Sequence, residues 1–158
     1  MAEGFECFGV DLYPMASYPG THLIGDILSF DPAPFYGLVD LVVASPPCDE
    51  FSRRSMPWFK NAPEPDLGLV NACYRIARAL RVPIVLENVR GAVPYLGQPV
   101  LRSGPFYLWG DGVPPIVPVC NPRKNAIGPR ADRPALRALI PIELARAVGR
   151  FHRNRLQL

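Results

Sequence analysis

Short apolar runs bounded by turn residues recur along the first two thirds of the chain. Four of them, residues 6–11, 22–26, 38–44 and 83–88, are predicted to be buried strands. The run 38–44 is almost continuously apolar and partly β-branched, which is typical of a strand covered on both faces. A further extended piece is expected at 105–109, within a region rich in proline and glycine, and a polar loop is expected after Cys48.

Two segments have helical spacing instead. The apolar residues of segment 66–80 are Leu69, Cys73, Ile76 and Leu80. A last helix is expected to begin near Pro141, with an apolar side made by Leu144, Ala145, Val148 and Phe151. Strands that alternate with helical crossovers predict an α/β fold, with a mostly parallel sheet covered by helices.

Composition narrows the classes of protein. The chain has 158 residues, 49% of them hydrophobic and 20% charged, so one globular domain over 1–158 is expected and intrinsic disorder is not. Its apolar runs are too short to cross a membrane, and its start does not resemble a signal peptide. The four cysteines are far apart and lack CxxC spacing, which disfavours a metal site or disulfides and favours a reducing, cytoplasmic setting.

Positive charge is concentrated in the arginine-rich C-terminal part, 123–158. Its basic residues are Arg123, Lys124, Arg130, Arg133, Arg137, Arg146, Arg150, Arg153 and Arg155. Only Asp132 and Glu143 oppose them, although the net charge of the whole chain is only +3. This asymmetry suits an anionic partner such as nucleic acid, and the alternative is a solvated basic helix and tail.

Chemically useful side chains follow the predicted strands, at Asp11, Asp26, Cys48 and Glu87. Because the carboxyl ends of parallel strands meet at one edge of a sheet, these groups are expected to converge there. Cys48 comes directly after two prolines, which stiffen the backbone and present the thiol at a corner. A nucleophilic thiol is therefore predicted beside the Glu87 carboxylate. The other three cysteines are expected to be small buried hydrophobes.

Two motifs in this order resemble those of a known family. Ala44-Ser-Pro-Pro-Cys48 followed by Glu87-Asn-Val-Arg-Gly91 resembles the DNA (cytosine-5)-methyltransferases. Segments 4–11, 25–27 and 140–145 extend the likeness, in order, to compact phage-type members. The resemblance implies a Rossmann-like fold, S-adenosylmethionine as cofactor, DNA as partner, and the cytoplasm of a bacterial or phage-infected cell as location.

The resemblance also implies roles for single residues. Cys48 would add to carbon 6 of a flipped cytosine, and Glu87 would donate a proton or hydrogen bond at N3 from a partly desolvated site with a raised pKa. Asn88 would hold the loop or the base edge, and Arg90 would reach the base or a phosphate.

For the cofactor, Asp11 would bind ribose, Leu12 adenine, and Asp26 the adenine amino group; turn chemistry is the alternative for both aspartates. The other implied cofactor contacts are Ile27, Pro46 and Pro47. The candidate DNA contacts are Ser52, Arg53, Arg54, Arg130 and Arg133. The candidates for base stacking, which otherwise pack locally, are Trp58, Phe59 and Trp109.

The sequence departs from the family at its start. The central first strand and the glycine-rich turn that cradles the methionine part of the cofactor are missing. Their absence is expected to leave neighbouring strands with unpaired edges and to remove half of the cofactor contacts. Three explanations stay open: the start lies too late, a second chain or a homodimer completes the sheet, or the chain is an inactive relative that binds DNA or a partner.

Overall fold

The computed structural model of the chain describes residues 4–16, 18–54, 63–120 and 140–156. Its elements in order are β1 (Phe8–Asp11), β2 (Thr21–Ile24), η1 (Ala33–Phe35), β3 (Val42–Ala44), α1 (Asp49–Arg54), α2 (Gly68–Leu80), β4 (Ile84–Asn88), η3 (Arg90–Ala92), α3 (Val93–Leu96), β5 (Leu101–Ser103), β6 (Phe106–Trp109) and α5 (Ile142–Leu156). No helix in these ranges is both long and apolar enough to cross a bilayer.

The strands form two sheets. β1 and β2 pair in parallel, and a second sheet has the order β3-β4-β6-β5. The α/β class predicted from the sequence is confirmed, but the second sheet is mixed rather than mostly parallel, because β6 runs antiparallel to both β4 and β5. The reason is local: β5 and β6 are joined by only Gly104 and Pro105, and so short a connection permits only an antiparallel hairpin.

Most of the predicted elements are confirmed, although β5, η1, η3 and α3 were not predicted. The prediction that 38–44 is covered on both faces is wrong, because Val43 of β3 is 56% exposed, and β1 is likewise only partly buried. Two further differences concern the start of β3 and the segment after Cys48. β3 begins only at Val42, since the chain before it forms a turn in which the Leu38 N–H donates to the Phe35 carbonyl over 3.0 Å. After Cys48 the structure has the short helix α1, where a loop was predicted. Helix α2 ends at Leu80 because Arg81 adopts a left-handed conformation with φ 59°.

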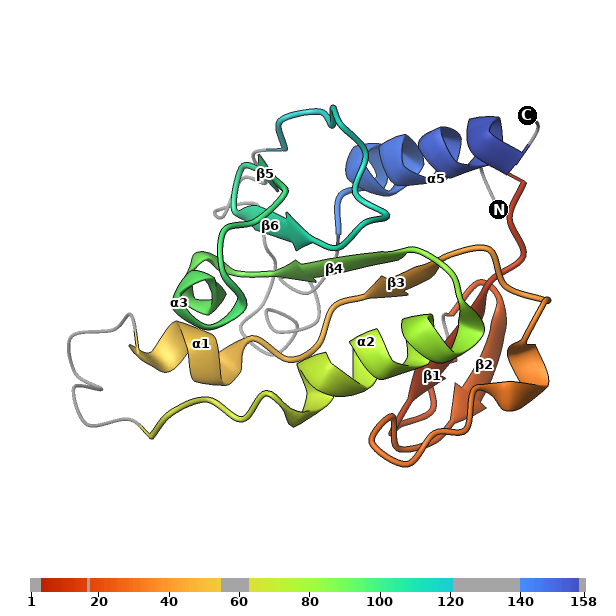
Figure 1. Cartoon of the computed structure of the whole chain (residues 1–158), viewed down its shortest axis with the longest axis horizontal. Coiled ribbons are helices and arrows are strands. Elements are labelled where there is room, and N and C mark those ends of the chain that lie inside the picture. Colours follow the sequence, from red (N-terminus) through yellow and green to blue (C-terminus); the bar gives the residue numbers. More distant parts are fainter. Residues whose placement is uncertain (1–3, 17, 55–62, 121–139, 157–158) are drawn as a thin grey trace.

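The four-stranded sheet lies between two helices, as Figure 1 shows. Successive side chains of β4 point to opposite faces of the sheet. Ile84 and Leu86 pack with the apolar side of α2, while Val85 packs with Leu144 and Val148 of α5. This alternation is the two-residue period of a strand, and it explains why 84–86 is apolar at every position.

Helix α2 also holds the smaller sheet in place. Its Arg75 guanidinium donates to the carbonyls of Ile27, Leu28 and Phe30, at 2.9, 3.3 and 3.1 Å. These carbonyls belong to the segment that follows β2, so one side chain ties the β1–β2 unit to the helix that covers β3 and β4. In the described parts of the chain no strand pairs with the second edge of β1 or of β3, in line with the expectation of unpaired edges.

Candidate functional site

The parallel pairing of β3 with β4 brings the two sequence motifs to one edge. Ala44 pairs with Leu86 at the end of the β3–β4 ladder, so the corner 45–48 continues beside Glu87 and Asn88, the last two residues of β4. Asn88 joins them: its amide Nδ2 donates to the Pro46 carbonyl over 3.1 Å, and its Oδ1 accepts from the Val89 N–H at 2.9 Å. The Asn88 side chain is only 1% exposed, so both bonds are shielded from water. Of the two roles predicted for Asn88, the structure contains the contact to the loop.

Cys48 lies at the start of α1, where its carbonyl accepts from the Ser52 N–H over 2.9 Å. Its thiol is half-buried rather than enclosed in the core. Burial raises the pKa of Cys48, and the carboxylates of Asp49 and Glu87 raise it further, while a hydrogen bond from the Ser52 side chain opposes them. The thiol is therefore accessible, but the protein's own nearby carboxylates favour its protonated form.

Glu87 is the acidic partner in this site. Burial raises the pKa of Glu87, and a hydrogen bond with the Ser45 side chain partly offsets that effect. This direction agrees with the sequence prediction for Glu87. Because the Glu87 charge in turn raises the pKa of Cys48, the two groups are electrostatically coupled.

A close backbone contact positions α1 against the end of β4. A Cβ atom at Gly91 would lie 2.2 Å from the Phe51 carbonyl oxygen, so only glycine fits where η3 meets α1. Phe51 is buried on the same side and its ring contacts Tyr95 of α3 at 5.9 Å between centroids. The sequence analysis missed Ser45, Phe51 and this role of Gly91. Only the glycine left a signal, since it closes the second motif.

The aspartates predicted to bind the cofactor are both exposed and make turns. The Asp11 Oδ1 accepts from the Tyr13 N–H at 3.0 Å, and the Asp26 Oδ1 accepts from the Leu28 N–H at 2.9 Å. Turn chemistry, the alternative considered for these residues, is thus present at both strand ends. Leu12 next to Asp11 is 57% exposed, whereas Ile27 packs against the core beside α2.

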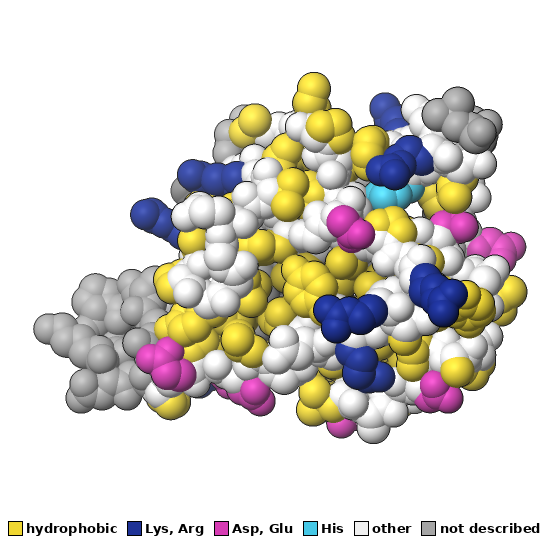
Figure 2. Space-filling model, viewed as in Figure 1, with side chains coloured by type: hydrophobic (Ala, Val, Ile, Leu, Met, Phe, Trp, Pro, Cys, Tyr) yellow, Lys and Arg dark blue, Asp and Glu magenta, His cyan; other side chains and the backbone are white. Residues whose placement is uncertain are grey.

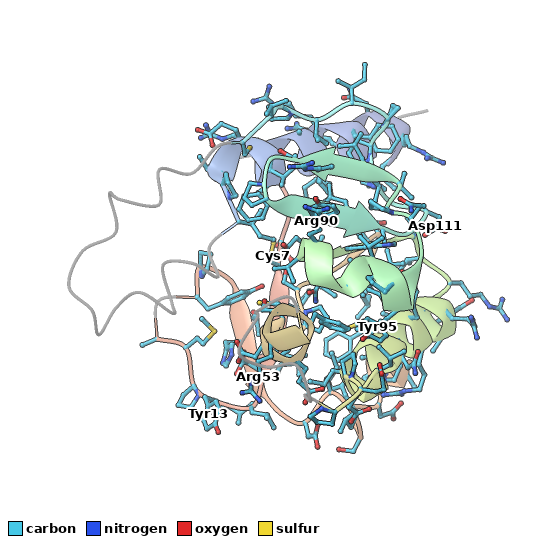
Figure 3. All side chains as sticks on the ribbon, turned by 90° about the vertical axis from the view of Figure 1, so that its left-hand side faces the viewer. Cys7, Tyr13, Arg53, Arg90, Tyr95 and Asp111 are labelled. Atoms are coloured by element: carbon cyan, nitrogen blue, oxygen red, sulfur yellow. The ribbon has the colours of Figure 1, made fainter. Side chains whose placement is uncertain are left out.

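The residues predicted to contact DNA differ in where they lie in the structure. Figure 3 looks onto the side of the molecule where α1 lies and labels the exposed Arg53 on α1 and the exposed Arg90 after β4. Ser52 contacts the thiol of Cys48 instead of facing away from it. Arg130, Arg133, Trp58, Phe59 and the side chain of Arg54 lie outside the described residues.

Two further observations concern DNA. Trp109 is 4% exposed and its Nε1 donates to the Gly97 carbonyl over 3.0 Å, so of the two roles considered for it the structure shows local packing and not an exposed ring for base stacking. On the face drawn in Figure 2, basic side chains gather over α2, and acidic ones are scattered over several parts of the face. Asp49 and Glu50, which follow Cys48 directly, are acidic residues in the first turn of α1, whereas Arg53 of the same helix and Arg90 after β4 are exposed basic residues.

Comparison with known proteins adds no relative: no family model, curated protein or solved structure matches the chain. Among the described residues no three histidine, cysteine, aspartate or glutamate side chains gather as a metal ion would require. The site is thus defined by its own chemistry, which is a half-buried thiol beside a partly buried carboxyl group on the carboxyl edge of a parallel strand pair.

Proposed function

We propose that this chain carries the methyl-transfer site of a DNA cytosine-5 methyltransferase with a Rossmann-like fold, in which Cys48 is the nucleophile and Glu87 the acid. The observation that carries the proposal is the Asn88–Pro46 hydrogen bond of 3.1 Å, which holds the thiol corner against the Glu87 strand end. The order and spacing of the two motifs in the sequence agree with this function.

The chemistry needs both groups. Carbon 5 of cytosine is too weak a nucleophile to accept a methyl group directly, so a thiolate must first add at carbon 6. Once carbon 5 carries the methyl group, loss of the carbon-5 proton to water breaks the carbon-6–sulfur bond, which restores the aromatic ring and the thiolate. A proton or hydrogen bond from Glu87 to N3 withdraws electron density from carbon 6 and assists that addition. The raised pKa of Glu87 favours the proton-bearing form that this role requires.

Protonation of Glu87 also assists Cys48. When Glu87 is neutral, one of the two carboxylates that raise the pKa of Cys48 loses its charge. The active combination is then a thiolate with a neutral acid, and the Ser52 hydroxyl stabilises that thiolate by a hydrogen bond. Since a cytosine in a duplex cannot reach this pair, the target base must be flipped out of the stack.

The residues present fit the nucleoside half of S-adenosylmethionine, which supplies an electrophilic methyl group when bound. A carboxylate has more acceptor sites than one turn hydrogen bond uses, so Asp11 and Asp26 still suit ribose hydroxyls and an adenine amino group. The exposed Leu12 offers an apolar surface to adenine, Pro46 and Pro47 form the corner before Cys48, and Ile27, next to Asp26 in sequence, packs against the core.

For DNA, the exposed Arg53 and Arg90 would contact phosphates beside the flipped base. The C-terminal end of α5 is at the amino end of β1, where the Arg153 guanidinium lies 3.5 Å from the Cβ position of Gly4. Arg153 is therefore at the edge opposite Cys48 and is not assigned to the target base.

The test separates addition from methyl transfer. Addition at carbon 6 makes carbon 5 exchange its hydrogen with water, so the chain should release tritium from DNA that contains [5-³H]cytosine without any methyl donor. Cys48→Ala should abolish release, and Cys7→Ala, which removes another part-buried thiol with a raised pKa, should not. With the donor added, 5-fluorocytosine DNA should become covalently trapped on Cys48.

Failure of both reactions with folded protein would refute the catalytic assignment. The runner-up, an inactive relative that binds DNA through its arginines, predicts binding that falls steeply with salt and is indifferent to Cys48→Ala.

A further inference from the structure

The smaller sheet has an open edge on β1. The Cys7 carbonyl accepts from the Thr21 N–H and the Asp11 carbonyl accepts from the Gly25 N–H, each at 2.9 Å. Because backbone groups alternate in direction along a strand, the N–H and C=O groups of Phe8 and Val10 face away from β2. No partner strand meets them within the described residues.

The larger sheet has an open edge on β3. The Val42 N–H donates to the Pro83 carbonyl over 3.0 Å, so Val42 faces β4 and the backbone groups of Val43 face the opposite way. The Val43 side chain is 56% exposed, although it lies in the middle of a strand whose neighbour Val85 is buried. Since Val43 pairs with Val85 and points to the same face of the sheet, its exposed side chain offers an apolar surface next to this open edge.

These two open edges begin at the same place. Phe8 at the start of β1 and Leu38 and Asp40 just before β3 line one hollow, together with Glu6 and Arg153. Phe8 and Leu38 are 43% and 68% exposed there. As Figure 1 shows, α2 runs beside both sheets, and Arg75 holds the β1–β2 unit against it.

We infer that the open edges of β1 and β3 bind a single extended strand from a different polypeptide, which joins the two sheets into one. A second copy of this chain suits the position less well, since every described strand is already paired and a copy would offer only another edge. Pairing by backbone hydrogen bonds on both sides is the chemistry by which a sheet takes up an added strand.

The residues beside the open edges of β1 and β3 indicate the side chains that the bound strand would carry. Phe8, Leu38 and Val43 call for apolar side chains, and the Glu6 and Asp40 carboxylates, set against the single Arg153 guanidinium, favour a lysine or arginine just before the apolar run. This inference rests on the backbone alone and does not depend on the methyl-transfer proposal. A chain that fails the tritium assay can still bind the strand.

Amide hydrogen exchange of the whole chain tests the inference. The probe is a peptide with a short run of valine and isoleucine between terminal lysines. It should slow exchange of the Val10 and Val43 amides at least roughly tenfold, because each gains a hydrogen bond. The Ile24 amide serves as the control, since Thr21 and Gly25 donate toward β1 and Ile24 therefore faces the outer edge of β2.

Proline variants locate the binding. Val10→Pro and Val43→Pro each remove one backbone N–H from the open edge of β1 or β3 and should weaken peptide binding by roughly tenfold. Ile24→Pro, on the outer edge of β2, should leave peptide binding unchanged. Protection of Val43 without Val10, or no binding by folded protein, would overturn the inference. A concentration-dependent dimer that Val43→Pro dissociates would identify the occupant as a second copy and overturn the choice of a different polypeptide.

Discussion

Replacing Asn88 by alanine tests whether one buried amide holds the thiol corner in place. The substitution removes the bond from Asn88 Nδ2 to the Pro46 carbonyl and the bond from the Val89 N–H to Asn88 Oδ1. Neither group gains a replacement from the alanine side chain. The Cys48 corner would then be held to β4 mainly by the packing of α1.

The magnitude follows from burial. Each lost hydrogen bond costs about 1 kcal/mol, and leaving buried partners unsatisfied adds a further 1–3 kcal/mol or so. With two bonds lost, we therefore expect Asn88→Ala to lower the free energy of unfolding by roughly 3–5 kcal/mol, which at a slope of about 2 kcal/mol per M moves the urea midpoint down by about 1.5–2.5 M. Burial is the first cause of the raised pKa of Cys48, so a loosened corner should also make the thiol react several-fold faster with iodoacetamide.

Ser103→Ala is the matched control. Ser103 is also fully buried, donates to the Pro118 carbonyl and accepts from the Cys120 N–H, but it lies in β5. Urea unfolding followed by tryptophan fluorescence should show a comparable loss for both variants, while only Asn88→Ala should change the alkylation rate of Cys48. Equal alkylation rates in the two variants, measured under native conditions, would refute the positioning role of Asn88.

Three further substitutions test the surroundings of the site. Glu87→Gln should stabilise the protein near neutral pH and not below the ordinary carboxyl pKa of 4.5. The reason is that the pKa of Glu87 is raised in the folded state, so ionisation of this carboxyl group lowers the free energy of unfolding as pH rises. Urea unfolding at several pH values measures the effect, and a gain that is independent of pH would contradict it. Gly91→Ala forces a Cβ to 2.2 Å from the Phe51 carbonyl and should cost about 1–3 kcal/mol in unfolding experiments, whereas Gly25→Ala, whose Cβ has its nearest neighbour at 3.8 Å, should cost less. Arg75→Ala should lower the free energy of unfolding by about 1–2 kcal/mol and speed amide hydrogen exchange in β1 and β2. Arg78→Ala, one helical turn further along α2, is the control and should change neither. Unchanged exchange in Arg75→Ala would contradict the bridging role of Arg75.

The spacing of apolar residues along the sequence predicted those helices and strands that are determined by short-range sequence pattern. The three- and four-residue spacing of Leu69, Cys73, Ile76 and Leu80 predicted α2 within two residues of its observed start at Gly68. The apolar run before Glu87 predicted β4, since a strand covered by α2 on one face and α5 on the other must be apolar at every position. The same pattern placed Cys48 and Glu87 at strand ends.

Pattern was less informative where the chain turns back on itself. The sequence analysis expected one extended piece at 105–109 and did not expect β5, so the hairpin that Gly104 and Pro105 make between the two strands was missed. Trp109 illustrates the same limit. Its sequence neighbours are as compatible with a surface loop as with a strand, yet β6 lies inside the sheet and buries the ring.

By itself, the sequence determined the strand and helix segments and the side chains that stand where the strands end, because periodicity and turn residues act over a few positions. The tertiary structure alone decided that Asn88 bonds to Pro46, 42 residues away, and that Arg75 reaches Ile27, 48 residues away. It also decided that the two sheets stay apart. Burial, coupled pKa values and open strand edges depend on which distant segments meet, and that information is absent from any short stretch of the chain.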